Sequence, residues 1–86
     1  MYYTYILKSK LNGKLYTGFT HDLRKRLSQH DTNKSVYTKY RGPYDLIYYE
    51  ACLDEKDAKY RELYLKSGRG KAYLKSRLKR FLLRTG

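Results

Sequence analysis

Cysteine is almost absent from this sequence, because Cys52 stands alone among 86 residues. A single cysteine cannot form a disulfide within the chain or build a metal cluster of several thiolates. Histidine is nearly as rare, and His21 and His30, without further cysteine or histidine neighbours, make a poor zinc site. These absences argue against a disulfide-stabilised or zinc-binding domain and favour a reducing, cytoplasmic compartment.

Long hydrophobic runs are missing as well. The apolar stretches are far shorter than the roughly 20 residues that a helix needs to cross a bilayer. The first residues, MYYTYILKSKLNG, lack the basic and then apolar regions of a secretory signal. We therefore expect a soluble protein with no membrane partner, and we interpret residues 1–86 as a single domain with a modest core.

Acidic residues are scarce, since eight Asp and Glu stand against twenty Lys and Arg and the formal net charge is +12 at pH 7. Such an excess repels itself and is easiest to explain when the partner is a polyanion. Composition therefore favours nucleic acid, either DNA or RNA, as the partner. A basic surface that is merely solvated is the alternative.

Two strands joined by a tight turn are predicted near the start of the chain. Residues 2–9 and 15–20 are rich in aromatic and β-branched side chains, and Asn12-Gly13 between them is a strong hairpin signal. A two-residue type I′ turn sets Tyr5 opposite Thr20, with Tyr5 and Tyr16 on one face but offset by four residues, roughly 13 Å. A three-residue loop with a bulge at Gly13 would instead send the two tyrosines to opposite faces.

The rest of the chain is predicted to form one more strand and three helices. A helix is predicted over 21–30, with Thr20 or Asp22 supplying the oxygen that caps its N-terminus. Leu23, Leu27 and His30 lie on one stripe of this helix, with Arg26 at its edge. A long polar loop then leads to a strand over 44–51. A second helix runs from Asp54 to about Lys66, glycines at 68 and 70 end it, and a third covers 71–84. This order predicts an α+β fold in which a small three-stranded antiparallel sheet is flanked by three helices.

One carboxylate in the second helix is unusual. Glu62 lies within about 60° of Ala58 and Leu65, among small and apolar neighbours, and a carboxylate placed there needs a cation. In the alternative, the helix turns Tyr60, Leu63 and Tyr64 inward and leaves Glu62 in water. The pattern of this helix alone favours neither arrangement.

Hydrolysis of a phosphodiester needs a divalent ion, a cation beside the developing charge and a group that takes a proton from water. Mg²⁺ can be held by one carboxylate, with waters and the substrate phosphate as its other ligands, and Glu62 can supply that carboxylate. Arg26 is always protonated and can bond two phosphate oxygens at once. A tyrosine can accept the proton or position the water.

Together these residues resemble the GIY-YIG nuclease domain. The resemblance rests on Tyr3-Thr4-Tyr5, Tyr16-Thr17-Gly18, Arg26 with His30, and Glu62 in AKYRELYLK, and it covers nearly the whole chain. It is closest to the small single-domain members, which the stretch LKSGRGKAYLKSRLKR also resembles.

The resemblance implies a DNA endonuclease that depends on Mg²⁺ or Mn²⁺, acts on phosphodiester bonds and has a link to DNA repair or recombination. It places Tyr5, Tyr16, Arg26 and Glu62 around one cleft as catalytic residues, with Glu62 as the metal ligand and His30 as a supporting residue. Tyr3, Thr4 and Thr17 depart from the family's motifs, and no Asn follows Glu62 as in many family enzymes. A nucleic-acid-binding module with weak or no catalysis is therefore the alternative, and a protein partner that supplies targeting is expected.

Binding residues are expected around this cleft. Gly18 lacks a Cβ and would let a phosphate approach the backbone, although an ordinary strand-end glycine has the same appearance. Lys66 and Arg69, beside two glycines, could clasp a phosphate, or they could simply belong to a turn between helices. The expected nucleic-acid-binding residues are Gly18, Arg24, Lys34, Lys39, Arg41, Lys66, Arg69 and Lys71. Most of the twelve tyrosines should pack, Tyr48, Tyr49, Tyr60 and Tyr64 among them, whereas Tyr37 and Tyr40 could stack on bases.

Overall fold

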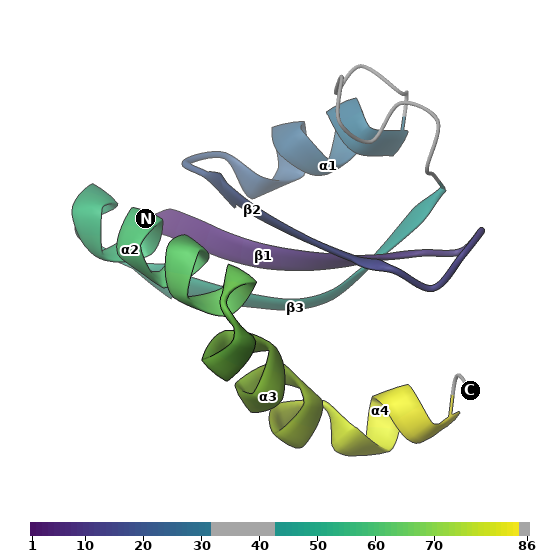
Figure 1. Ribbon diagram of the computed structural model, residues 1–86. Coiled ribbons are helices and arrows are strands. Elements are labelled where there is room, and N and C mark those ends of the chain that lie inside the picture. Colours follow the sequence, from purple (N-terminus) through teal and green to yellow (C-terminus); the bar gives the residue numbers. More distant parts are fainter. Residues whose placement is uncertain (32–42, 85–86) are drawn as a thin grey trace.

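The computed structural model describes residues 1–31 and 43–84, which form a three-stranded antiparallel sheet and four helices (Figure 1). In chain order these are β1 (Tyr2–Ser9), β2 (Leu15–Thr20), α1 (Leu23–Asp31), β3 (Tyr44–Cys52), α2 (Glu55–Lys66), α3 (Gly68–Arg77) and α4 (Lys79–Arg84). The predicted α+β class is confirmed. The predicted positions that lie outside the described residues are Lys34, Tyr37, Lys39, Tyr40 and Arg41.

The strands are hydrogen-bonded in the order β2-β1-β3, so β1 is the central strand. Because successive side chains of a strand point to opposite faces, β1 contributes to two cores at once. One core holds Tyr5, Leu7 and Tyr44, and α1 packs on it through Leu23 and Leu27. Figure 1 shows α1 alone on this side of the sheet, as the predicted stripe of this helix requires.

The opposite face of the sheet carries the second core. Ile6 of β1 packs there against Leu65 of α2 and Leu74 of α3, and all three are nearly inaccessible to solvent. Helices α2, α3 and α4 follow one another on this side of the sheet (Figure 1). The sheet therefore separates α1 from the three C-terminal helices.

The predicted two-residue turn between β1 and β2 is wrong. Residues 10–13 form a four-residue loop, and the Ser9 amide donates to the Lys14 carbonyl at 2.9 Å. The Ser9 hydroxyl holds this loop, since it accepts from the amides of Leu11 and Asn12 at 3.1 and 3.3 Å. Gly13 has the positive φ of 74° that the loop needs to return to the sheet.

The longer loop moves the strand register by two residues from the predicted one. Tyr5 pairs with Gly18 and Leu7 pairs with Tyr16. A shift by an even number preserves the face on which each side chain lies. Tyr5 and Tyr16 are therefore on one face, as predicted, but they are offset by two residues instead of four.

Acidic residues precede the two helices that directly follow strands, α1 and α2. Asp22 precedes α1 and accepts from the Lys25 amide at 3.1 Å, so this helix starts two residues later than predicted. Asp54 is the N-cap of α2 and accepts from the Lys56 and Asp57 amides, as the sequence predicts. These carboxylates satisfy amides that have no partner within the helix.

The C-terminal region differs from the prediction in two ways. Ser67 is extended and caps α3, so Gly68 and Gly70 belong to α3 and do not end α2 as C-caps. A further break at Leu78 divides the single helix predicted for 71–84 into α3 and α4. Gly70 is needed because α3 crosses α2 closely: a Cβ there would collide with the backbone of Tyr64 and Leu65.

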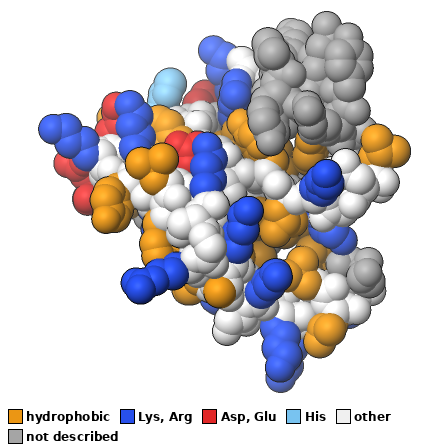
Figure 2. Space-filling view, in the orientation of Figure 1, with side chains coloured by type: hydrophobic (Ala, Val, Ile, Leu, Met, Phe, Trp, Pro, Cys, Tyr) orange, Lys and Arg blue, Asp and Glu red, His pale blue; other side chains and the backbone are white. Residues whose placement is uncertain are grey.

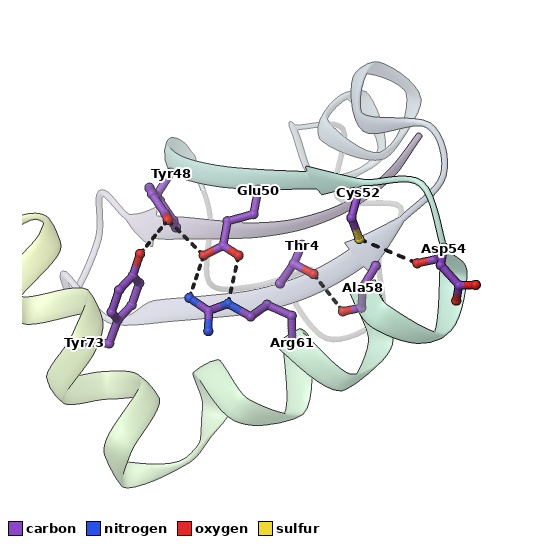
Figure 3. A network of polar contacts seen from close by, with 8 residues as sticks. All are labelled: Thr4, Tyr48, Glu50, Cys52, Asp54, Ala58, Arg61 and Tyr73. Atoms are coloured by element: carbon purple, nitrogen blue, oxygen red, sulfur yellow. Dashed lines mark hydrogen bonds and ion pairs between the residues drawn. The ribbon is translucent and has the colours of Figure 1, made fainter.

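A polar network fastens α2 and α3 to β3 (Figure 3). Arg61 of α2 forms a bidentate ion pair with Glu50 of β3, with nitrogen to oxygen distances of 2.8 and 3.0 Å. Tyr48 donates to Glu50 at 2.8 Å, and its hydroxyl also lies 3.2 Å from that of Tyr73 in α3. Burial, together with these hydrogen bonds, raises the pKa of Tyr48. Because the network joins three elements, it fixes how α2 is rotated on the sheet.

Candidate active site

Three predicted site residues meet at the hydroxyl of Tyr5. Arg26 Nε donates to this hydroxyl at 3.3 Å, and His30 Nε2 lies 2.9 Å from it. Tyr5 and His30 are both almost fully buried, and α1 places Arg26 and His30 one turn apart on the side that faces the sheet. A hydrogen-bonded cluster therefore links the central strand to α1.

Tyr16 belongs to the same cluster. Its ring centroid lies 6.3 Å from that of Tyr5 and 5.3 Å from that of His30. Unlike Tyr5, Tyr16 is partly exposed to solvent. The two tyrosines predicted to share a face do so, and the corrected register brings their rings into contact range.

Gly18 allows Tyr5 to take this position. A Cβ at Gly18 would collide with the ring and hydroxyl of the directly opposite Tyr5, passing 2.9 Å from its Cε1 atom. The close approach predicted at this glycine is made by a tyrosine ring of the protein. A place for Gly18 in nucleic-acid binding stays a prediction.

Burial raises the pKa of Tyr5 to about 12, partly opposed by the hydrogen bond from Arg26. The negative charge of Glu62 contributes a smaller increase. Conversely, hydrogen bonding to Tyr5 raises the pKa of Arg26, and the Tyr16 hydroxyl adds to this effect. Arg26 is thus a fixed cation between two phenols, and Tyr5 keeps its proton at neutral pH.

The orientation of α2 resolves the two alternatives left by its sequence. Ala58 and Leu65 are buried, whereas Tyr60 and Leu63 are 76% and 67% exposed. Glu62 therefore lies on the packed side of the helix, and only 22% of its side chain is exposed. The predicted packing of Tyr60, and of Tyr49 in β3, is wrong because both rings are largely exposed.

Glu62 has a cationic partner within its own helix. Lys66 Nζ lies 3.3 Å from Glu62 Oε2, one turn along α2. No group of three His, Cys, Asp or Glu side chains suited to a metal ion occurs within residues 1–31 and 43–84. A single partly buried carboxylate fits Mg²⁺ or Mn²⁺, which can complete their coordination with waters and phosphate oxygens. Glu62 is the residue that would hold such an ion.

The remaining predicted binding residues lie near the cluster to different degrees. Lys66 and Lys71 line a groove beside β2, together with Tyr16. Arg24 and Arg69 are exposed. Gln29 was not predicted, yet Arg26 Nη1 donates to its Oε1 at 2.9 Å. The three-residue spacing of Arg26 and Gln29 on one helix is a signal that could have revealed this contact.

Comparison with known proteins identifies the family. Residues 1–80 match the GIY-YIG catalytic domain. The chain belongs to the GIY-YIG family. The match covers both tyrosine motifs, Arg26 and Glu62, so the resemblance read from these residues is confirmed.

Several relatives of this chain are bacterial proteins named UPF0213. UPF0213 protein CPE1444 from Clostridium perfringens is 43% identical over 67 residues, which span 77% of this chain and 71% of that protein. UPF0213 protein SpyM3_1077 from Streptococcus pyogenes is 47% identical over 57 residues, 65% of this chain and 60% of that protein. The solution structure of UPF0213 protein BH0048 from Bacillus halodurans, 38% identical, has a TM-score of 0.55 and covers 88% of this chain and 84% of that one.

Proposed function

We propose that this protein is a Mg²⁺- or Mn²⁺-dependent endonuclease that hydrolyses phosphodiester bonds of DNA. Membership of the GIY-YIG family supports nuclease chemistry on nucleic acid in general. The observation that carries the proposal is the cluster in which Arg26, His30 and Tyr16 surround the Tyr5 hydroxyl, with the Glu62 charge close enough to act on it. Within the described residues, no helix is long and apolar enough to cross a membrane.

Arg26 is suited to stabilise charge on the phosphate. Its Nε bonds Tyr5 and its Nη1 bonds Gln29, so two contacts hold the guanidinium in a fixed direction. A cation that is already oriented does not have to reorganise when charge develops on the phosphate oxygens, and it therefore favours the transition state. Mg²⁺ at Glu62 would supply polarisation of the same phosphate when bound.

The two tyrosines are suited to different tasks. Tyr16 is partly exposed, unlike Tyr5, and we assign to it the positioning of the attacking water. Tyr5 is inaccessible, and Arg26 can only donate to it. Tyr5 can then direct its own proton to His30 Nε2, which makes His30 the acceptor that orients Tyr5 within the cluster.

The test is the nicking of supercoiled plasmid with Mg²⁺ or Mn²⁺, and with chelator, by wild type and by Glu62→Gln. The variant should lose nicking but bind DNA nearly as before, because the amide keeps the shape of the side chain but lacks its charge. Glu55→Gln is the matched control, since Glu55 is on the same helix and pairs with Lys59 in an exposed position. Equal nicking by wild type and Glu62→Gln, or loss of nicking in both variants, would contradict the assignment of Glu62.

A nucleic-acid-binding module without efficient catalysis is the second candidate. The Lys66 ammonium already neutralises the carboxylate that a metal needs, and no Asn follows Glu62 as it does in many family enzymes. Binding of DNA without metal-dependent nicking of double-stranded, single-stranded or branched DNA would favour this candidate. Recruitment by a protein partner and a role in DNA repair belong to the first proposal and depend on its test.

A further inference from the structure

A groove with a volume of about 670 Å³ runs along β2, an edge strand of the sheet, where α2 and α3 pass beside it. Its walls carry four lysines, Lys14, Lys66, Lys71 and Lys75. Its size lies within the range of roughly 300 to 1,000 Å³ that is usual for sites of small organic groups. The groove therefore has room for more than a phosphate.

The charge of the groove is of one sign. None of the described residues that line it is acidic, and the lysines come from the loop before β2, from α2 and from α3. Figure 2 shows basic side chains with hydrophobic ones between them on the part of the molecule formed by the C-terminal helices, whereas acidic side chains gather elsewhere on this face. Such a cluster of ammonium groups complements a strand of phosphates.

The groove also has apolar walls. Leu15, Leu65 and Leu74 line it together with the lysines, and Leu15 is 41% exposed. The backbone of an intact duplex presents sugars and charged phosphates and offers little to cover such a surface. An unpaired nucleobase has a flat apolar face that can cover it while the flanking phosphates meet the lysines.

The groove is continuous with the candidate active site at two points. Tyr16 lines the groove and also packs against Tyr5 and His30. Lys66 lines it and is ion-paired with Glu62. A nucleotide in the groove would therefore be adjacent to the phosphodiester that the Tyr5 cluster and Glu62 receive.

We propose that this groove binds one unpaired nucleotide of the substrate strand next to the scissile phosphate, with its base against Leu15 and its phosphates on Lys71 and Lys75. The inference rests on the proposed function, because that function is what makes the neighbouring phosphate the one that is cleaved. The substrate class is DNA with an unpaired nucleotide. A fully paired duplex cannot fill the groove without first extruding a base, and the loss of pairing and stacking opposes binding.

Binding measured with chelator present tests the groove separately from catalysis. Fluorescence anisotropy should show that wild type binds a duplex with one unpaired nucleotide about tenfold more tightly than the same duplex fully paired. Lys71→Gln/Lys75→Gln should reduce this preference to within about twofold and lower the salt slope of single-strand binding by about 1.4. The matched control is Lys56→Gln/Lys79→Gln, which removes the same charge from exposed lysines outside the groove and should keep the preference.

A second measurement reports on the base itself. A fluorescent adenine analogue at the unpaired position should change its emission on binding to wild type, and Leu15→Thr, which keeps a strand-forming residue, should reduce that change. Equal affinity for paired and unpaired DNA, or equal loss in the groove and control variants, would overturn the inference. So would binding of a free mononucleotide or of polyglutamate as tightly as the strand. Cleavage without a preference for unpaired DNA would support the nuclease function and contradict nucleotide binding in the groove. A preference without cleavage would support nucleotide binding and contradict the nuclease function.

Discussion

Gly18 and Tyr5 lie directly opposite each other on β2 and β1, and the tyrosine ring occupies the space that a side chain at Gly18 would fill. The glycine motif and the tyrosine motif are therefore two halves of one packing arrangement. Tyr5 reaches Arg26 and His30 only because its neighbour across the strand has no Cβ.

Gly18→Ala should consequently destabilise the protein by about 1 to 3 kcal/mol, because the methyl group overpacks a buried site. Gly68→Ala is the control, since nothing lies within 4 Å of a Cβ at that position and it begins α3. Alanine there should leave stability unchanged or raise it by up to about 1 kcal/mol. Urea denaturation of both variants measures the difference, and equal stabilities would contradict the packing argument.

The pKa of Tyr5 makes stability depend on pH in alkaline solution. This phenol is inaccessible and has its pKa raised to about 12, whereas it ionises near 10 in the unfolded chain. The folded state thus holds the proton more tightly, and the stabilisation is complete below pH 10 and is lost as the pH rises towards 12.

The free energy of unfolding should therefore fall between pH 10 and 12, by up to about 1.4 kcal/mol per pH unit from Tyr5. Tyr48, whose pKa is also raised, contributes in the same direction, so the comparison needs Tyr5→Phe. Urea unfolding at several pH values should give a shallower decline for Tyr5→Phe. Parallel curves for the two proteins would mean that Tyr5 is not protected from ionisation.

Arg61 is expected to matter more for stability than other charged residues on α2. Its fork bonds both oxygens of Glu50, and its guanidinium lies 4.9 Å from the Tyr64 ring centroid and 4.8 Å from that of Tyr73. Arg61→Lys cannot keep the bidentate geometry and should cost about 1 to 2 kcal/mol. Lys59→Ala, which breaks an exposed pair with Glu55, should cost no more than about 1 kcal/mol. Thermal or urea unfolding of both variants measures the two costs.

Gln29 should act on the reaction through Arg26. Removing its carbonyl by Gln29→Ala takes away one of the contacts that orient the guanidinium, and we expect the rate at saturating DNA to fall about tenfold, or about 1.4 kcal/mol. Arg24→Gln on the same helix should weaken DNA binding and keep that rate. Single-turnover nicking with a DNA titration separates the two effects, and a change in affinity alone for Gln29→Ala would refute the positioning role.

Periodicity and family motifs predicted the parts of the fold that depend on local sequence. Asp54 was identified as the start of α2 because a capping carboxylate acts on amides two and three residues away. The stripe of Leu23, Leu27 and His30 was identified because residues three and four apart lie on one face of a helix. The face shared by Tyr5 and Tyr16 followed from strand alternation, even though the assumed turn was wrong.

Features that depend on contacts outside the recognised motifs could not be predicted. The Ser9 hydroxyl, which precedes the Asn12-Gly13 signal, favours a four-residue loop over the two-residue turn that this signal indicates. The inward orientation of Glu62 depends on how α2 crosses the sheet. The ion pair between Arg61 of α2 and Glu50 of β3 fixes this crossing. Gly68 and Gly70 looked like a helix end, but Gly70 permits a close helix crossing. The first outcome was decided by a side chain next to the loop, and the other two by the packing of α2 on the sheet and on α3.

The ion pair between Lys66 and Glu62 has a consequence for how the protein behaves in solutions depleted of divalent ions. An isolated partly buried carboxylate is less favourable than one with a counterion beside it. Here the Lys66 ammonium, one helical turn away, balances the Glu62 charge, so the folded protein supplies its own counterion. We therefore expect that removal of divalent ions by a chelator leaves the fold intact. An ion that binds Glu62 would displace the flexible Lys66 side chain.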